Sequence, residues 1–255
     1  MRFASLGSGS QGNALIVDAG ETKVMVDCGF SARMAAARLA RLGAVPAELS
    51  AILVTHEHGD HVGGVFAFAR RHGLTVYLTH GTHAVASRGV SALPACQLID
   101  GHTPFTIGGL EVTPFPVPHD AREPVQYTFA DGGRRLGVLT DTGSITPHIV
   151  EVLRACDALV LECNHDYAML AASRYPAMLK QRIGGRFGHL ENAQAASLLR
   201  QIDTSRLQHL VAAHLSAENN RPQLAVAALA AALGCSEDWI GVADQEGGFA
   251  WRQLS

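Results

Sequence analysis

The segment "THEHGDH" places four side chains that can bind metal ions within six consecutive positions, namely His56, His58, Asp60 and His61. It directly follows the apolar run "AILVT" (51–55), which predicts a buried strand. A chain leaving a strand points residues i and i+2 to the same side, so His56 and His58 can bind one ion. Asp60 and His61, at the start of the next predicted helix, can face a second ion. Because mixed imidazole and carboxylate donors suit zinc, iron or manganese, the segment favours a metal site over a polar surface loop.

Three more side chains of this kind end other apolar runs along the chain. His119 follows the run in "FPVPHD", Asp141 the run in "LGVLTDTG", and His214 the run in "LVAAHLS". Taken alone, each of these residues is more readily a surface or capping residue than a ligand. Together with the first cluster they form the order H-x-H-x-D-H, H, D, H, which favours a centre for two ions assembled at the ends of strands.

The glycine-rich segment "GSGSQGN" (7–13) contains the spacing G-x-G-x-x-G at Gly7, Gly9 and Gly12. In a dinucleotide-binding fold the last glycine of this motif opens a helix whose N-terminus faces the pyrophosphate. Here "ALIVDAG" follows, which predicts a short strand and a turn. A loop between two strands offers no helix dipole, so we do not predict a dinucleotide site.

The composition is that of a globular protein with a large core, because 47% of the 255 residues are hydrophobic and 17% are charged. No apolar run approaches the ~20 residues of a membrane span, and "MRFASLGSGS" lacks the apolar centre of a signal peptide, so we expect a cytoplasmic protein without a membrane partner. Five cysteines without a C-x-x-C pair indicate reduced, buried thiols. A net charge of −3 gives no general reason to expect a nucleic-acid partner.

The elements that must position these residues alternate along the chain. Strands are predicted at 14–17, 22–29, 51–55, 75–79, 96–100, 158–163, 207–214, 239–243 and 249–254, with hairpins turning at 108–109 and 131–133. Helices are predicted at 31–43, 62–73, 82–89, 147–156, 175–183, 191–202 and 222–233. Hairpins combined with helix-strand alternation predict an α+β fold of two mixed β-sheets packed face to face with helices outside, in a single domain over residues 1–255.

With these features, the sequence closely resembles the metallo-β-lactamase-fold hydrolases over nearly its whole length. The resemblance implies an αββα sandwich with the site at one sheet edge. It also implies that the first metal is held by His56, His58 and His119, the second by Asp60, His61 and His214, and that Asp141 bridges the two. The motifs "GSGSQGN", "VDCGFS", "NHD", "RYP", "LKQRI", "GHLEN" and "AHLSAENN" are similar to those of the YycJ/WalJ branch, which is linked to nuclease chemistry.

Two divalent ions ~3.5 to 4 Å apart would lower the pKa of a shared water and present hydroxide at neutral pH. We expect zinc first, with manganese or iron as alternatives, and Asp60 orienting the hydroxide. With neutral histidines the site keeps a net positive charge, which attracts a phosphodiester. The expected function is therefore a metal-dependent phosphodiesterase or nuclease that acts on nucleic acid, DNA or RNA, from an end.

His189 in "GHLENAQAA" lies outside the expected ligand set. Its position resembles that of the histidine near the leaving group in phosphodiesterase members of the family, where it can donate a proton to the departing oxygen. The alternative is that His189 merely starts the helix at 191–202. This residue favours phosphodiester chemistry over the thioester chemistry of relatives with the same ligands.

Substrate contacts are expected from two segments. Between Asp166 and Glu191 the chain carries basic residues and no acid, so Lys180 and Arg182 can follow a nucleic-acid backbone, unless they belong to a solvated helix face. The glycine-rich loop can bring backbone N–H groups close to an anion, with Ser10 and Asn13 as additional donors, or its glycines serve only the turn.

Other residues and functions stay open. Asp27 is either a residue that steadies a metal-binding histidine or a plain turn residue. His165 fits no ligand spacing, and the remaining histidines are expected at the surface or at helix ends. The alternative functions are a small-molecule hydrolase, acting on a cyclic or short phosphodiester or a thioester, and a metal-binding regulatory protein without turnover.

Overall fold

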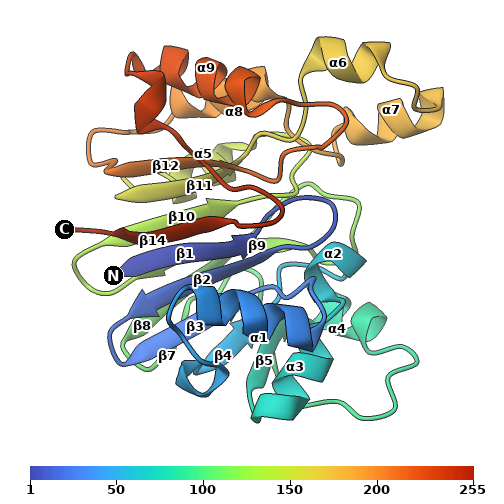
Figure 1. The fold of residues 1–255 in the computed structure, drawn as a ribbon, viewed down its shortest axis with the longest axis vertical. Coiled ribbons are helices and arrows are strands. Elements are labelled where there is room, and N and C mark those ends of the chain that lie inside the picture. The colour runs from blue at the N-terminus through green and yellow to red at the C-terminus, as the bar shows by residue number, and fades with distance from the viewer.

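Two seven-stranded sheets packed face to face form the centre of the fold in the computed structural model, which describes residues 1–255 (Figure 1). The first sheet has, in spatial order, β14 (Phe249–Gln253), β1 (Arg2–Gly7), β2 (Ala14–Ala19), β3 (Thr22–Val26), β4 (Ala51–Leu53), β5 (Thr75–Thr79) and β6 (Cys96–Ile99). The second has β13 (Gly241–Val242), β12 (His209–Ala213), β11 (Ala158–Glu162), β10 (Arg135–Leu139), β9 (Val125–Ala130), β8 (Leu110–Pro116) and β7 (Phe105–Ile107). Each sheet contains both parallel and antiparallel pairs.

Helices cover the outer faces of both sheets, which confirms the αββα sandwich. They are α1 (Ala32–Arg41), α2 (Gly59–Val62), α3 (Val65–His72), α4 (His80–Ala86), α5 (Pro147–Val152), α6 (Tyr167–Ala172), α7 (Ala177–Ile183), α8 (Asn192–Leu199) and α9 (Pro222–Leu233), with short 3-10 helices at Pro46–Glu48 and Glu237–Trp239. Figure 1 shows α1 to α4 on one side of the molecule, α8 and α9 on the opposite side, and α6 and α7 projecting at one corner. None of these helices combines the length and the apolarity that crossing a membrane requires.

Three apolar clusters hold the layers together. One lies between the two sheets and includes Phe3, Tyr127 and Phe129, each fully buried. Each of the other two lies between one sheet and the helices that cover its outer face. Because most strands are covered on both faces, they are continuous apolar runs rather than alternating ones, as the fully buried β11 "ALVLE" shows.

Several predicted elements differ from the observed ones in their bounds. The helix predicted at 62–73 begins only at Val65, as α3, and Gly63 and Gly64 separate it from the short helix α2, which ends at Val62. A Cβ at Gly64 would collide with the carbonyl oxygen of Phe30, so the chain must pass this point without a side chain. The helix predicted at 82–89 begins earlier, at His80, where the Thr79 side chain accepts a hydrogen bond from the backbone N–H of Thr82.

The C-terminal part also departs from the prediction. The six-residue helix α6 was not predicted, since its short segment lacks an apolar period. In the predicted strand 239–243, Trp239 belongs instead to a 3-10 turn and β13 has only two residues. The predicted hairpins at 108–109 and 131–133 are confirmed, because β7 pairs with β8 and β9 with β10 in antiparallel register.

Candidate metal centre

The seven residues predicted as metal ligands lie together at one edge of the sandwich; this set is called the candidate metal centre below. They come from the loop after β4, from α2, and from the ends of β8, β10 and β12. Since β10, β11 and β12 are parallel neighbours, their carboxyl ends meet at the same sheet edge. The residues are His56, His58, Asp60, His61, His119, Asp141 and His214.

The backbone at this edge is held in an unusual conformation. Only four non-glycine residues of the chain have positive φ, and three of them are Asp27 (59°), Asp141 (50°) and His214 (54°). A non-glycine residue in this region carries strain of about 1–3 kcal/mol, which persists where the surroundings hold it. The strain is therefore concentrated where the strands turn their polar side chains toward one another.

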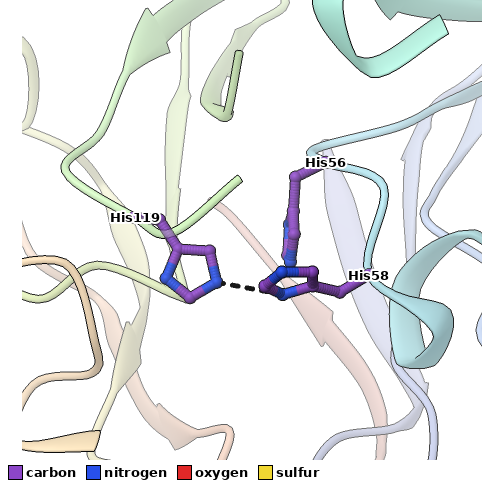
Figure 2. A group of neighbouring side chains, drawn as sticks. All are labelled: His56, His58 and His119. Atoms are coloured by element: carbon purple, nitrogen blue, oxygen red, sulfur yellow. Dashed lines mark hydrogen bonds between the residues drawn. The ribbon is translucent and has the colours of Figure 1, made fainter. Parts of the chain in front are cut away.

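His56, His58 and His119 converge from two different segments (Figure 2). One ring nitrogen of each lies within 4.8 Å of the others, and Nδ1 of His58 is 3.2 Å from Nε2 of His119. The rings of His56 and His58 meet edge to face with centroids 4.6 Å apart. Three imidazoles in this arrangement match one side of a mixed-ligand metal site.

Asp60, His61 and His214 form a second group beside the first. The Oδ2 atom of Asp60 lies 3.5 Å from Nε2 of His61 and 3.5 Å from Nε2 of His214. Asp141 lies between the groups, with Oδ2 3.1 Å from Nε2 of His61 and Oδ1 4.0 Å from Nε2 of His119. A carboxylate in this position reaches both groups, as expected for a bridging ligand.

The donor atoms fit a pair of metal ions. Donors around tetrahedral zinc at about 2.0–2.1 Å lie roughly 3.3 Å apart, and the separations of 3.1 to 3.5 Å around Asp60, Asp141 and His214 agree with this spacing. Nε2 of His56, Oδ2 of Asp141 and Nε2 of His214 are buried without any hydrogen-bond partner. A buried polar group left in this state costs about 1–3 kcal/mol, a cost that a bound cation removes.

Acceptors behind the rings orient two of the histidines. Nδ1 of His61 lies 2.8 Å from the Asp27 carboxylate, and Nδ1 of His119 lies 3.0 Å from the Gly188 carbonyl oxygen. A carboxylate and a carbonyl can only accept, so Nδ1 donates in both rings and leaves Nε2 free to face the centre. Of the two roles considered for Asp27, this geometry favours the one that steadies a histidine.

Glu162, at the end of β11, was overlooked in the sequence. Its Oε2 atom accepts hydrogen bonds from the backbone N–H of Thr142 (3.0 Å) and of Leu190 (3.1 Å). Its Oε1 atom lies 2.8 Å from Nδ1 of His189 and 3.3 Å from Nδ1 of His214. Burial disfavours the charged carboxylate, but the two histidines outweigh burial and lower the pKa of Glu162 to about 2. The signal that could have revealed it is the single acid that ends the apolar run "ALVLE".

His189 lies beside the candidate metal centre rather than within the predicted ligand set. Its ring stacks at 27° over His214 with centroids 5.4 Å apart, and Nδ1 is 3.4 Å from Oδ1 of Asp141. Burial opposes protonation, yet the carboxylates of Glu162 and Asp141 outweigh it and raise the pKa of His189. The start of α8 is capped instead by Glu191, whose side chain and that of Gln194 form a capping box.

A cleft of about 280 Å³ opens onto the centre and is lined by Asp60, Asp141, His189 and His214. Of the predicted substrate contacts, Ser10 and Arg182 line this cleft. Nε of Arg182 donates a hydrogen bond of 2.5 Å to Asp120, a second acid that the sequence did not single out.

The other two predicted contacts do not line this cleft, although Nδ2 of Asn13 lies 3.1 Å from Nε2 of His61 at the candidate metal centre. The Asn13 amide is buried under the glycine-rich loop, where it donates to the Gly9 carbonyl (3.0 Å) and accepts from the Gly9 N–H (2.8 Å). In this way it shapes the loop around Gly9 and Gly12, whose φ values of 144° and 148° favour glycine. Nζ of Lys180 donates to the Ala171 carbonyl (2.6 Å) and lines a separate hollow of about 550 Å³.

The remaining histidines and the cysteines lie outside the centre. His165 is buried and has no hydrogen-bond partner at Nδ1, but it belongs to none of the clusters of metal-binding side chains. The histidines predicted at the surface or at helix ends are all partly or fully exposed, namely His72, His80, His83, His102, His148 and His209. All five cysteines are free thiols, and three of them are buried.

Comparison with known proteins adds an independent observation. A family model described as a beta-lactamase superfamily domain matches residues 22–214. Exodeoxyribonuclease YycJ of Bacillus anthracis is 37% identical over 88% of this chain and 86% of its own, and exodeoxyribonuclease WalJ of Streptococcus pneumoniae is 31% identical over 94% and 91%. The crystal structure of Zn(2+)-bound PqqB from Methylobacterium extorquens has a TM-score of 0.76 at 20% identity over the full length of both chains, a likeness of fold.

Proposed function

The chain belongs to the beta-lactamase superfamily, in the branch that contains the YycJ and WalJ exodeoxyribonucleases, and from this premise we propose that it is a metal-dependent phosphodiesterase that degrades nucleic acid from an end. The observation that carries the proposal is the pairing of the candidate metal centre with His189, a histidine held by Glu162 at the wall of the same cleft. DNA is the polymer named for the relatives, and RNA is the comparison to make.

The candidate metal centre would hold two divalent ions, for which zinc is the first choice and manganese and iron are alternatives. The three histidines of Figure 2 would hold one ion and Asp60, His61 and His214 the other, and Asp141 lies within reach of both groups of residues. When bound, such a pair supplies a hydroxide nucleophile at neutral pH and stabilises the charge that develops at phosphorus.

The chain's own residues orient the reacting groups. Asp60 lines the cleft and accepts a hydrogen bond from the nucleophile, which fixes its direction of attack. His189 donates the proton on Nε2 to the leaving oxygen, while Glu162 accepts from Nδ1 and stabilises the charged imidazole. Ser10 and Arg182, which line the cleft, contact the phosphate. Asn13 acts through the shape of the glycine-rich loop. Lys180 contacts the nucleic-acid strand farther from the cleft.

The test is an assay with end-labelled single- and double-stranded DNA and RNA and with enzyme reconstituted with zinc, manganese or iron. We expect products that shorten from one end, and no activity in the Asp141→Asn variant under the same conditions. Hydrolysis of small phosphodiesters or thioesters without cleavage of any polymer would contradict the proposal and identify a small-molecule hydrolase.

A further inference from the structure

The segment 166–188, which carries α6 and α7 and is called the arm below, has an unusual surface. The three most exposed large apolar side chains of the whole protein lie on it: Met178 (82% exposed), Tyr167 (73%) and Phe187 (61%). Its charged residues after Asp166 are all basic, namely Arg174, Lys180, Arg182 and Arg186. Interleaved apolar and cationic side chains are the composition of surfaces that bind single nucleic-acid strands, because bases stack on rings and phosphates pair with cations.

Tyr175 connects the arm to the catalytic cleft. It lines the cleft together with Asp141 and His189, and it also lines a second hollow of about 440 Å³. The second hollow is bounded by Arg174 and by Glu218. A route therefore runs from the candidate metal centre past the Tyr175 ring to a guanidinium group.

Resting on the proposed function, we propose that Tyr175 stacks on the base next to the scissile phosphate and that Arg174 binds the following phosphate in the second hollow. The nucleic-acid strand leaves the metal centre beside Arg174, because the carboxylate of Glu218, which lines the same hollow, repels phosphate. The occupant is a single strand with at least one unstacked base. A cyclic nucleotide or a mononucleotide ester fills the cleft alone and leaves the second hollow empty.

The experiment compares a dinucleotide, a trinucleotide and bis(p-nitrophenyl) phosphate as substrates. Loss of a stacked base typically weakens binding by roughly 5- to 150-fold, so Tyr175→Leu should raise the KM for the trinucleotide by that factor with little change in kcat. Tyr175→Phe keeps the ring and should retain the normal KM. Arg174→Gln should reduce the advantage of the trinucleotide over the dinucleotide.

Tyr77→Leu is the matched control, because it makes the same change at a half-buried ring outside the arm that lines neither of these two spaces. It should leave the KM for all three substrates unchanged, as should Tyr175→Leu for bis(p-nitrophenyl) phosphate. An unchanged trinucleotide KM in Tyr175→Leu, or an equal loss on all three substrates, would overturn the subsite. Failure of the proposed function is distinguishable, since the unaltered enzyme would then not cleave the nucleotides at all.

Discussion

Replacing Glu162 with glutamine removes the carboxylate that His189 and His214 share. The amide oxygen of glutamine can take the place of Oε2 and keep the hydrogen bonds from the Thr142 and Leu190 N–H groups. Its NH₂ group then faces the Nδ1 atoms of both histidines, where Oε1 stood at 2.8 and 3.3 Å. Since NH₂ cannot accept, each ring must rotate or move its proton to Nε2, which in His214 is the atom that faces the centre.

The expected losses of metal affinity and of activity follow from these contacts of Glu162 with His189 and His214. Residues that orient a metal ligand are typically worth 10- to 100-fold in metal affinity, or about 1.4 to 2.7 kcal/mol. Because His214 is the one proposed ligand that Glu162 touches, one ion should bind more weakly and the other should be unaffected. His189 loses its orienting partner as well, so activity on a poor leaving group should stay low even when both ions are bound.

Asp27→Asn is the comparison variant, because it makes the same change behind His61, and the hydrogen-bond partners of the Asp27 carboxylate are Thr55 and His61 rather than His189. Metal affinity is measured by competition with a chromophoric chelator, and hydrolysis is measured at saturating metal. Both variants should lose affinity for one ion. At saturating metal Asp27→Asn should recover on oligonucleotides, whereas Glu162→Gln should stay at least about a hundredfold slow, the lower value of general acid catalysis.

The reasoning is refuted if Glu162→Gln binds both ions with normal affinity and cleaves oligonucleotides at the normal rate. Equal recovery of the two variants at saturating metal would refute the orienting role toward His189 alone.

Two further substitutions test other parts of the site. His189→Ala should bind both ions normally and cleave a nucleotide linkage ~10² to 10⁴ times more slowly, with a much smaller loss on bis(p-nitrophenyl) phosphate, whose leaving group departs without a proton; equal losses on both substrates would contradict proton donation. Gly29→Ala would drive a Cβ into the carbonyl of Asp60 in helix α2, so it should lower the free energy of unfolding of the metal-free protein by about 1–3 kcal/mol and weaken metal binding. Gly59→Ala, within α2 itself, adds a Cβ that meets no atom within 4 Å and should have neither effect. Equal melting temperatures for the two glycine variants would contradict this account of the α2 position.

The sandwich and the gathering of polar side chains at the ends of its strands were predictable because the signals are local. An apolar run followed by a polar metal-binding residue marks the end of a buried strand, and His119, Asp141 and His214 all follow this pattern. Parallel pairing of β10, β11 and β12 then brings the strand ends to one edge. The hairpin turns at 108–109 and 131–133 were predictable for the same reason, because neighbouring glycines between apolar runs are a local signal.

What escaped prediction depends on contacts between distant segments. The partners of Glu162 come from three other parts of the chain, so the residues around "ALVLE" do not predict that Glu162 orients His189 and His214. The break between α2 and α3 is imposed by the Phe30 carbonyl, about thirty positions earlier. Asn13 and Lys180 are bonded to nearby backbone atoms that the sequence does not reveal.

The central claim is that one chain binds two ions at the candidate metal centre, and anomalous diffraction from crystals of the zinc-reconstituted protein tests it most directly. The account predicts two peaks roughly 3.5 to 4 Å apart, one beside His56, His58 and His119 and the other beside Asp60, His61 and His214, with Asp141 in contact with both. A single peak, or two peaks away from these side chains, would contradict it.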